Sequence, residues 1–246
     1  MRRYDFSAHR LFVDGELAPG AVVVCRADQA NYLRNVLRLG PGDQILIFNG
    51  RDGEWRARIA DARKSTTTLN VEAQLRPQQS APDIDYLFAP LKRARLDYLV
   101  QKATEMGVAR LRPIFTRRTT PDRINGARMR ANAIEAAEQC GILRVPEVLD
   151  AETLASAMAR WDPGRRLIFC DEDSDHADPL AALGALDPGP LALLVGPEGG
   201  FEDAERELIT SQAFAVRICL GPRILRADTA AVAALALVNA TLGDWR

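Results

Sequence analysis

Residues 191–200 read Leu-Ala-Leu-Leu-Val-Gly-Pro-Glu-Gly-Gly, an apolar run that ends in a loop with three glycines. Five consecutive apolar residues bounded by turn residues are typical of a strand that is buried on both faces of a parallel sheet. Glycines directly after such a strand let the backbone adopt positive φ and approach a ligand closely. Because open α/β sheets bind ligands outside the carboxyl ends of their strands, this loop is a candidate binding site.

The sequence on both sides of this stretch, from residue 83 onward, alternates apolar runs with helical patterns. The expected strands span 84–89, 110–115, 166–170, 191–195 and 215–220, and the expected helices span 94–106, 126–139, 151–160, 202–211 and 229–242. In the first helix Leu96, Leu99, Val100 and Ala103 share one face, and Gly107 stands where a left-handed residue is favoured. The alternation predicts an α/β fold with a mostly parallel sheet and helices on both faces.

The first 76 residues follow a different pattern of short strands and glycine-containing turns. The expected strands span 21–25, 44–48, 55–59 and 68–72, which predicts a small barrel. One helix interrupts them, with Asp28 as its expected N-cap and Leu33, Val36 and Leu37 as its apolar stripe. Residues 77–82, Pro-Gln-Gln-Ser-Ala-Pro, are polar and bracketed by prolines. The predicted organisation is therefore a domain at 1–76, a linker at 77–82 and a domain at 83–246.

The composition of the 246 residues, 47% hydrophobic and 26% charged, is ordinary for a globular protein. The longest apolar run, 230–238, is far shorter than the roughly 18 residues that a membrane-spanning helix requires. Residues 1–6 carry charges but no apolar segment follows them, so a secretory signal is not expected. These observations predict a cytoplasmic protein without a membrane partner.

The cysteines and histidines exclude several kinds of site. The four cysteines are scattered without any Cys-x-x-Cys pair, and only two histidines are present. Neither a metal centre nor a disulfide framework is therefore expected. A hydrolase with a Ser–His or Cys–His pair is disfavoured, because only two histidines could serve as its base. Phosphate-binding P-loop and dinucleotide-binding glycine motifs are also absent from the sequence.

The charge of the chain is unevenly distributed, although its formal net charge is only −1. Residues 1–150 carry an excess of 6 positive charges, residues 151–246 carry an excess of 7 negative charges, and 29 of the 32 cations are arginines. Arginine suits bidentate phosphate contact and base stacking. Charge alone leaves both an RNA-binding surface and an ordinary solvated surface open.

A second unusual loop precedes the longest apolar run. Residues 220–229, Leu-Gly-Pro-Arg-Ile-Leu-Arg-Ala-Asp-Thr, lead directly into the apolar segment 230–238. A helix of that composition is expected to be buried on every side. A charged loop in front of a buried helix is unfavourable unless it serves a site, so this loop is the second candidate.

Several motifs together resemble one known family. They are Leu-Leu-Val-Gly-Pro-Glu-Gly-Gly-Phe at 193–201, Leu-Gly-Pro-Arg-Ile-Leu-Arg-Ala-Asp-Thr-Ala-Ala at 220–231, Gln-Lys-Ala-Thr-Glu-Met-Gly-Val at 101–108, Ala-Ala-Glu-Gln-Cys-Gly at 136–141 with Arg-Val-Pro-Glu at 144–147, and Tyr-Leu-Arg-Asn-Val-Leu-Arg-Leu at 32–39. In this order they closely resemble the bacterial 16S ribosomal RNA uridine-N3 methyltransferases of the SPOUT superfamily.

The resemblance implies a fold, a cofactor and partners. It implies a PUA-like RNA-binding domain followed by a SPOUT domain whose C-terminal part forms a deep trefoil knot. The implied partners are 16S ribosomal RNA or the small ribosomal subunit and a second copy of the chain, with no metal. S-adenosylmethionine is implied to lie against the loops at 194–200 and 219–226. The implied cofactor-binding residues are Leu194, Val195, Gly196, Pro197, Glu198, Gly200, Cys219, Leu220, Gly221, Ile224, Leu225 and Arg226.

Methylation of uracil N3 requires that its proton be removed or that the uridine anion be stabilised. The two loops contain no histidine, which leaves Glu198, Arg223, Arg226 and Asp228 as the nearby ionisable groups. We favour Arg226 as the stabiliser of negative charge. Glu198 or Asp228 is the candidate base, provided that burial raises its pKa. A simple Arg226–Asp228 pair that holds the loop is the structural alternative. The expected RNA-binding residues are Arg34, Arg38, Lys92, Arg93, Arg95, Arg117, Arg118 and Arg123.

The chain departs from the family pattern at four positions. Ile142 stands where arginine is common, Glu202 replaces a Ser or Thr, and Ala227 with Asp228 replaces Thr-Glu. Two other functions therefore stay open. One is a non-catalytic RNA-binding or ribosome-assembly protein that retains the fold. The other is an α/β enzyme that uses the 196–200 loop for a different anionic ligand.

Overall fold

A computed structural model describes residues 8–62, 66–120, 123–173 and 178–245 of the chain. The chain divides into two compact units, residues 1–80 with 137–145 and residues 81–136 with 146–246. Residues 137–145 thus belong with the first unit, which the division expected from the sequence does not include. Residues 1–6, in which no secretory signal is expected, lie outside the described residues.

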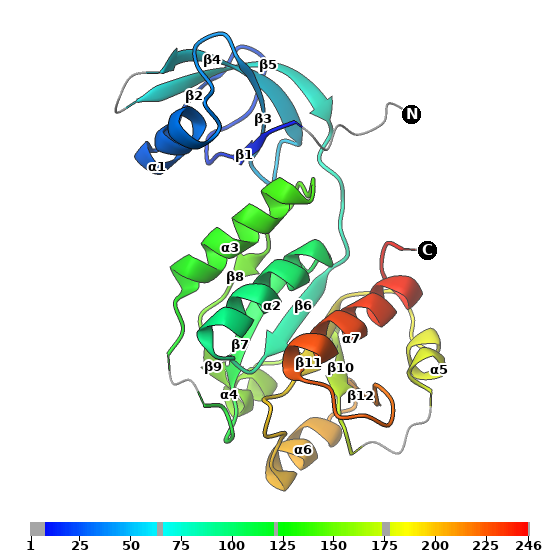
Figure 1. Ribbon diagram of the computed structural model, residues 1–246. Helices are drawn as coiled ribbons and strands as arrows, with labels where there is room; N and C mark the ends of the chain where they lie inside the picture. The colour runs from blue at the N-terminus through cyan, green and yellow to red at the C-terminus, as the bar shows by residue number, and fades with distance from the viewer. Residues whose placement is uncertain (1–7, 63–65, 121–122, 174–177, 246) are drawn as a thin grey trace. The chain divides into compact units, whose positions relative to one another are not determined.

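The first unit is a curled five-stranded sheet in the order β1-β3-β4-β5-β2 (Figure 1). Only β1 and β3 run parallel, and the remaining pairs are antiparallel. Alternate residues such as Ile45, Ile47, Leu69 and Val71 point into its core. The elements are β1 (Arg10–Phe12), β2 (Val22–Val24), α1 (Ala27–Asn31), the π-helical turn η1 (Tyr32–Val36), β3 (Gln44–Phe48), β4 (Glu54–Ala62) and β5 (Thr67–Arg76).

Helix α1 begins earlier than the sequence pattern predicts. Arg26, not Asp28, is its N-cap residue. The backbone N–H of Arg26 donates to Oε1 of Gln29 at 2.9 Å. Asp28 lies inside the helix. The prediction of Asp28 as the N-cap is therefore wrong.

The turn that follows α1 explains a second difference from the predicted helix. The Leu37 N–H donates to the Tyr32 carbonyl oxygen at 3.0 Å, five residues back along the chain. Leu33 is buried as predicted, but the wider π-turn leaves Val36 61% exposed. The expected helical stripe therefore breaks at Val36.

A buried charge cluster joins the barrel strands to residues 137–145. Arg10 is only 6% exposed. Its Nε donates to Oε1 of Glu54 at 2.6 Å, and Arg76 Nε donates to the other oxygen of that carboxylate at 2.8 Å. The two guanidinium groups also donate to the backbone oxygens of Ala137, Glu138, Gly141 and Ile142. Buried charges persist when they are paired and hydrogen-bonded, so the cluster accounts for the place of 137–145 in this unit.

The second unit is a seven-stranded sheet in the order β12-β10-β11-β6-β7-β8, with β9 paired to β7. Every strand pair in it is parallel, which confirms the predicted α/β fold. The strands are β6 (Ile84–Phe88), β7 (Arg110–Phe115), β8 (Glu147–Val148), β9 (Glu152–Thr153), β10 (Arg166–Cys170), β11 (Leu191–Val195) and β12 (Ala215–Ile218). The helices are α2 (Arg93–Glu105), α3 (Gly126–Gln139), α4 (Leu154–Ala159), α5 (Pro179–Gly184), α6 (Asp203–Thr210) and α7 (Ala227–Thr241).

Helices cover both faces of this sheet. On one face α2 and α7 run side by side, with α5 against α7 (Figure 1). Helices α4 and α6 pack on the other face, where Leu154 and Ile209 meet Leu167, Phe169 and other strand residues. All five residues of β11 are buried, as predicted for an apolar run between two helical layers.

Helix α7 is less buried than its sequence predicts. Ala231, Ala234, Leu235 and Val238 are buried. A stripe at helical spacing on its other side is only half-buried or exposed, and it comprises Val232, Ala233, Ala236, Leu237 and Ala240. The prediction that the helix is buried on every side is therefore wrong for this single chain. Within the described ranges, no helix combines the length and apolar character that crossing a membrane requires.

Candidate active site

A pocket of about 270 Å³ lies at the carboxyl ends of β10, β11 and β12. These are three adjacent strands, so the loops that follow them meet at one edge of the sheet. The lining residues are Cys170, Asp171, Glu172, Val195, Gly196, Pro197, Glu198, Gly199, Gly200, Cys219, Leu220, Gly221, Arg223, Ile224, Leu225, Ala227 and Ala230. The pocket brings together the two loops that the sequence singles out.

Three glycines give the pocket its backbone shape. Gly200 and Gly221 have φ of +69° and +97°, values that side-chain-bearing residues rarely adopt. At Gly196 an added Cβ would overlap the ring of Phe201, which is 2% exposed and packs edge-on against Phe169. The loop therefore needs glycine at 196 because its backbone lies directly on the core.

Most of the predicted cofactor-binding residues line this pocket. They are Val195, Gly196, Pro197, Glu198, Gly200, Cys219, Leu220, Gly221, Ile224 and Leu225. Leu194 instead points into the core beside α4 and α6. Arg226 is exposed and is the N-cap residue of α7, outside the lining.

The loop after β10, which the sequence pattern did not single out, supplies Cys170, Asp171 and Glu172. Asp171 is 2% exposed and accepts hydrogen bonds from Arg206 and from Nη2 of Arg217, the latter at 2.7 Å. Arg206 also donates to Glu172 at 2.7 Å. The signal was available, because this loop follows the predicted strand 166–170 as the other two loops follow theirs.

Two groups at this wall, Arg206 and Cys170, have shifted pKa values. Burial lowers the pKa of Arg206, but the neighbouring carboxylates, including Asp171 and Glu172, outweigh burial and raise that pKa above its usual value. Burial, with Asp171 and Cys219 nearby, raises the pKa of the Cys170 thiol. Cys170 is therefore protonated at neutral pH and is no nucleophile.

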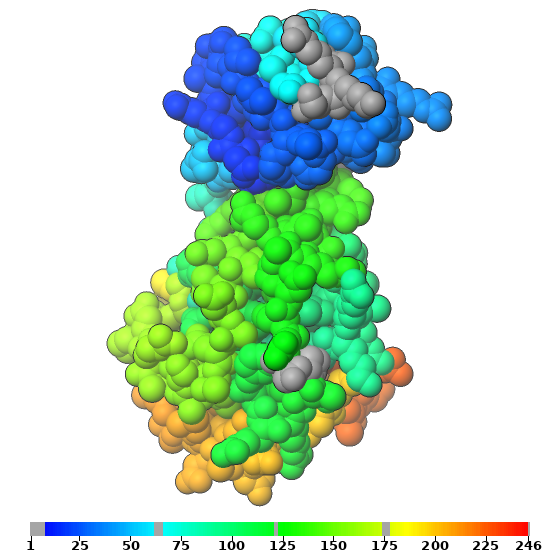
Figure 2. Space-filling model, turned by 90° about the vertical axis from the view of Figure 1, so that its left-hand side faces the viewer, coloured from blue at the N-terminus to red at the C-terminus, as the bar shows by residue number. Residues whose placement is uncertain are grey.

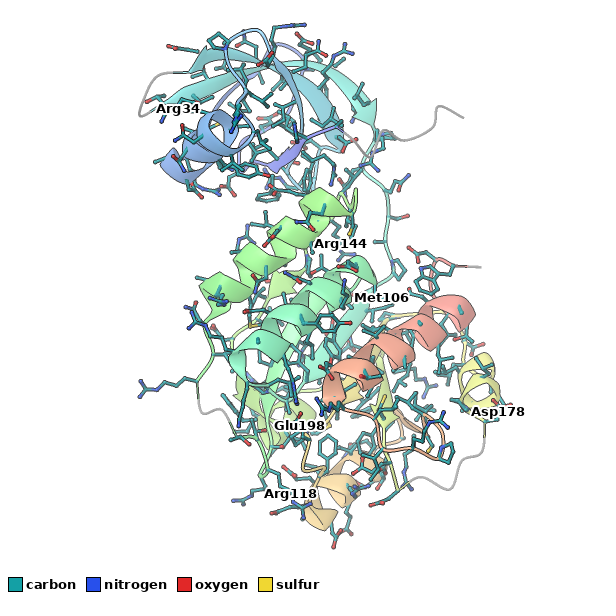
Figure 3. The ribbon with its side chains drawn as sticks, viewed as in Figure 1. Arg34, Met106, Arg118, Arg144, Asp178 and Glu198 are labelled. Carbon is teal, nitrogen blue, oxygen red and sulfur yellow. The ribbon has the colours of Figure 1, made fainter. Side chains whose placement is uncertain are left out.

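Two of the cations expected to bind RNA contact the 196–200 loop. Arg95 forms an ion pair with Glu198, which lies between the first turn of α2 and the start of α7 (Figure 3). Arg118 donates from Nη1 to the Gly199 carbonyl oxygen at 2.8 Å. Both side chains remain partly exposed, but they also hold the loop in place.

The three predicted catalytic residues do not converge on one point. Glu198 lines the pocket, whereas Arg226 and Asp228 do not. Asp228 Oδ1 accepts from the Thr229 N–H at 2.9 Å. In the described part of the chain Arg226 and Asp228 form no ion pair, so the alternative in which they simply pair is not what the structure contains.

The remaining predicted RNA-binding cations lie in both units. In the second unit Lys92, Arg93, Arg117 and Arg123 are exposed. In the first unit Arg34 is half-buried in η1, and Arg38 is exposed with φ of +58°. No group of three or more potential metal ligands occurs in the ranges that the structure describes.

Two family models match this chain. An RNA methyltransferase domain matches residues 78–239, and an RNA methyltransferase PUA domain matches residues 26–72. The first match covers most of the second unit, including all three loops of the pocket.

Curated relatives and solved structures agree with these matches. The ribosomal RNA small subunit methyltransferase E of Synechocystis is 31% identical, over 96% of this chain and 78% of its own. The enzyme of that name from Rickettsia conorii is 29% identical, over 94% and 95%.

Two similar structures contain the methyl donor. A Legionella pneumophila protein described as a methyltransferase, in complex with S-adenosylmethionine, has a TM-score of 0.84 and 29% identity, over 96% of this chain and 99% of its own. The ribosomal RNA small subunit methyltransferase E of Neisseria gonorrhoeae, bound to S-adenosylmethionine, has a TM-score of 0.82 and 25% identity, over 97% and 100%. With its parallel sheet, its PUA domain and these matches, the chain belongs to the RNA methyltransferase family.

Proposed function

We propose that this protein transfers a methyl group from S-adenosylmethionine to N3 of a uridine in 16S ribosomal RNA of the small ribosomal subunit. The observation that carries the proposal is the pocket formed by the loops after β10, β11 and β12. Relatives of the same architecture are ribosomal RNA small subunit methyltransferases, and two similar proteins were solved with the methyl donor bound. We further expect the chain around the last of these loops to be threaded as a trefoil knot.

The residues of the pocket fit S-adenosylmethionine. Gly200 and Gly221 carry no side chain, so an adenine edge can approach the backbone of the pocket closely. Ile224 is 89% exposed in the pocket wall and offers an apolar surface to a ring. When bound, the cofactor supplies an electrophilic methyl group on a sulfonium.

The chain itself must deal with the N3 proton. We assign Arg226 to the stabilisation of negative charge on a uracil carbonyl oxygen, because its exposed guanidinium is free of ion pairs with the described residues. Glu198 is the preferred base because it lines the pocket, and Asp228 is the less favoured one because it does not. The Glu198 side chain is 52% exposed, so this choice rests on its position and not on the burial expected from the sequence. The Arg95–Glu198 pair fixes the carboxylate at this position.

We propose that the active unit is a homodimer. The half-exposed stripe on α7, defined above by Val232, Ala233, Ala236, Leu237 and Ala240, is apolar throughout. An apolar helix face next to a pocket is typical of the centre of a subunit interface. Arg226 and Asp228 lie at the start of the same helix, so a second copy covering the stripe would also approach them.

We assign RNA binding to both parts of the chain. We expect the protein to act in the cytoplasm. The barrel, proposed as an RNA-binding domain at 1–76, contributes Arg34 and Arg38. The domain proposed at 83–246 contributes Lys92, Arg93, Arg117 and Arg123. These cations would contact phosphate groups, so the affinity of the protein for RNA should fall steeply as the salt concentration is raised.

Mapping of methylated uridines in ribosomal RNA by mass spectrometry tests the proposal. RNA from cells lacking the gene should lose one N3-methyluridine of 16S RNA, and the purified protein with S-adenosylmethionine should restore it. The Gly221→Val variant should not restore it. RNA and cofactor binding without any methylated product would instead identify a non-catalytic assembly protein.

A further inference from the structure

A second cavity, of about 440 Å³, lies beside the candidate active site. It is formed by residues that follow β6 and β7, and β6 is the direct neighbour of β11. The lining residues are Leu91, Lys92, Arg93, Leu96, Asp97, Thr120, Arg123, Ile124, Asn125, Arg128 and Met129. On the face seen in Figure 2, the surfaces of α2 and α3 lie next to each other, and the Arg128–Asp97 ion pair joins them.

The cavity holds three cations without a compensating carboxylate. Lys92, Arg93 and Arg123 are exposed and form no ion pair with any residue that the structure describes. The two oxygens of Asp97 accept from Nη2 and Nε of Arg128 at 2.6 and 2.8 Å, and Asp97 also attracts Arg93 electrostatically. These hydrogen bonds hold the pKa of Asp97 below its usual value, so the pair stays ionised at neutral pH. With four cations and this one carboxylate, the lining keeps an excess of three positive charges.

The start of α2 adds to this positive potential. Lys92 is the N-cap residue of this 13-residue helix, and its side chain forms no cap hydrogen bond. Its backbone carbonyl oxygen accepts from the Arg95 N–H at 2.9 Å, so the N–H groups of Arg93 and Ala94 are the ones available to a ligand. Arg93 follows it, although cations at a helix N-terminus oppose the helix dipole and are unfavourable there. A bound anion would satisfy both the free N–H groups and the cations.

The other wall of the cavity is apolar. Leu91, Leu96 and Met129 are buried, and Ile124 is half-buried. An inorganic anion makes no apolar contact with such a wall. A nucleotide has a phosphate for the cations and a flat ring that can pack against the apolar wall. The volume lies within the range of pockets that hold small organic ligands.

We propose that this cavity binds one unpaired nucleotide of the substrate RNA next to the methylated uridine. Its phosphate contacts Lys92, Arg93 and Arg123, and its base packs against Ile124 and Met129. The inference rests on the proposed function, because the neighbouring pocket must hold the methyl donor. Arg95 follows Lys92 and Arg93 in the first turn of α2 and forms an ion pair with Glu198 of that pocket, so the start of α2 connects the two sites.

Methyl groups at the cavity provide a direct test. The full chain, labelled with ¹³C at the Ile and Met methyl groups, is titrated with uridine monophosphate, uridine, inorganic phosphate and a short oligoribonucleotide. Uridine monophosphate and the oligonucleotide should shift the Ile124 and Met129 signals. Uridine and phosphate should each bind at least about tenfold more weakly than the monophosphate, because each lacks one half of the contacts.

Variants separate this site from the rest of the surface. Arg93→Gln and Arg123→Gln should each weaken binding of uridine monophosphate by about tenfold and raise the KM for RNA, with S-adenosylmethionine affinity unchanged. Arg130→Gln is the matched control, since Arg130 is exposed on α3 outside the cavity lining. An equal loss in Arg130→Gln would overturn the site.

The outcomes also distinguish this inference from the proposed function. If the protein methylates RNA but neither nucleotide probe shifts the two methyl signals, the cavity assignment is wrong. Phosphate that binds as tightly as uridine monophosphate likewise rejects a nucleotide site. If the nucleotides bind here as described but no methylation of RNA occurs, the cavity assignment stands and the proposed function fails.

Discussion

Arg95 in the first turn of α2 forms an ion pair with Glu198 in the loop after β11. Their side chains are 36% and 52% exposed, so the pair contributes little to folding, on the order of 1 kcal/mol or less. Its importance is positional. Glu198 stands in the wall of the pocket, and its only ion-pair partner in the described structure comes from the neighbouring strand–helix connection.

Replacement of Arg95 should therefore affect catalysis more than stability. We expect Arg95→Gln to lower kcat by about tenfold through misplacement of Glu198, with the melting temperature nearly unchanged. Glu198→Gln should lower kcat further, and adding Arg95→Gln to it should have no additional effect on kcat. Single-turnover methylation assays measure the effects of the single and double variants. Additive losses in the double variant would show that Arg95 acts independently of Glu198.

Two neighbouring glycines provide a matched pair for testing the cofactor loop. Gly196→Ala should abolish S-adenosylmethionine binding and destabilise the protein by about 1–3 kcal/mol, because the new methyl group overlaps buried Phe201. Gly199→Ala should retain binding, since its Cβ would lie 3.4 Å from the flexible Arg118 side chain. Calorimetric titration and urea unfolding measure the two effects. Equal affinity in both variants would remove the 196–200 loop from the cofactor site.

The role of Arg226 can be separated from cofactor binding. Arg226→Ala should bind S-adenosylmethionine nearly normally, because Arg226 lies outside the pocket lining, but lose about a hundredfold in turnover. Arg226→Lys should recover only part of the loss, since a point charge replaces a planar group. Methylation at the normal rate by Arg226→Ala would show that Arg226 does not stabilise the uridine anion, and it would leave Glu198 as the candidate catalytic residue.

The apolar stripe on α7 predicts the oligomeric state. Wild-type protein should sediment as a dimer at micromolar concentration, and Ala236→Glu should produce an inactive monomer, because it places a charge in an apolar interface. Ala236 is half-buried in the single chain, so the longer side chain can reach solvent and the variant should still fold. Val22→Glu is the control, as Val22 is a 61% exposed apolar residue on β2. A fully active wild-type monomer would contradict the proposed dimer.

Acid should weaken the barrel through Asp52. Its carboxylate accepts from the Leu17 N–H at 3.0 Å and from Asn49 Nδ2 at 2.6 Å, and these bonds lower the pKa of Asp52. The stabilisation is complete above the ordinary aspartate pKa of about 4 and is lost as pH falls through the lower folded value. Asp52→Asn should thus be less stable at pH 7 and flatten the acid limb of the stability curve. Urea unfolding from pH 7 to pH 2 measures this, with Asp187→Asn, an exposed position, as the control.

Several strands and one long helix were predictable from the sequence with their ends. Strands β7, β10 and β11 and helix α3 begin and end at the predicted residues. Short elements were missed: β1 has three residues, β8 and β9 have two each, and α5 has six. A periodic pattern cannot be recognised over so few residues. At α5 a local signal existed, because Asp178 accepts from the N–H groups of Leu180 and Ala181 and Pro179 follows it.

The site was predictable where it follows the sheet and unpredictable where it depends on distant partners. The glycine-bearing loops were found because each follows an apolar strand. Arg95 and Arg118 could be identified as cations, but the sequence gives no sign that they contact Glu198 and Gly199, which lie about a hundred and about eighty residues away along the chain. The burial of Arg10 has the same cause, since Glu54 and the carbonyl groups near residue 140 are remote in sequence.

The order of translation gives the pocket a further property. Its walls come from residues between Cys170 and Ala230, whereas the barrel strands end at Arg76 and the cation-lined cavity is complete by Met129. A growing chain therefore exposes its arginine-rich portion before any of the methyl-donor pocket has been synthesised. The pocket is complete only when the loop before α7 and the first turn of that helix have left the ribosome that is making them.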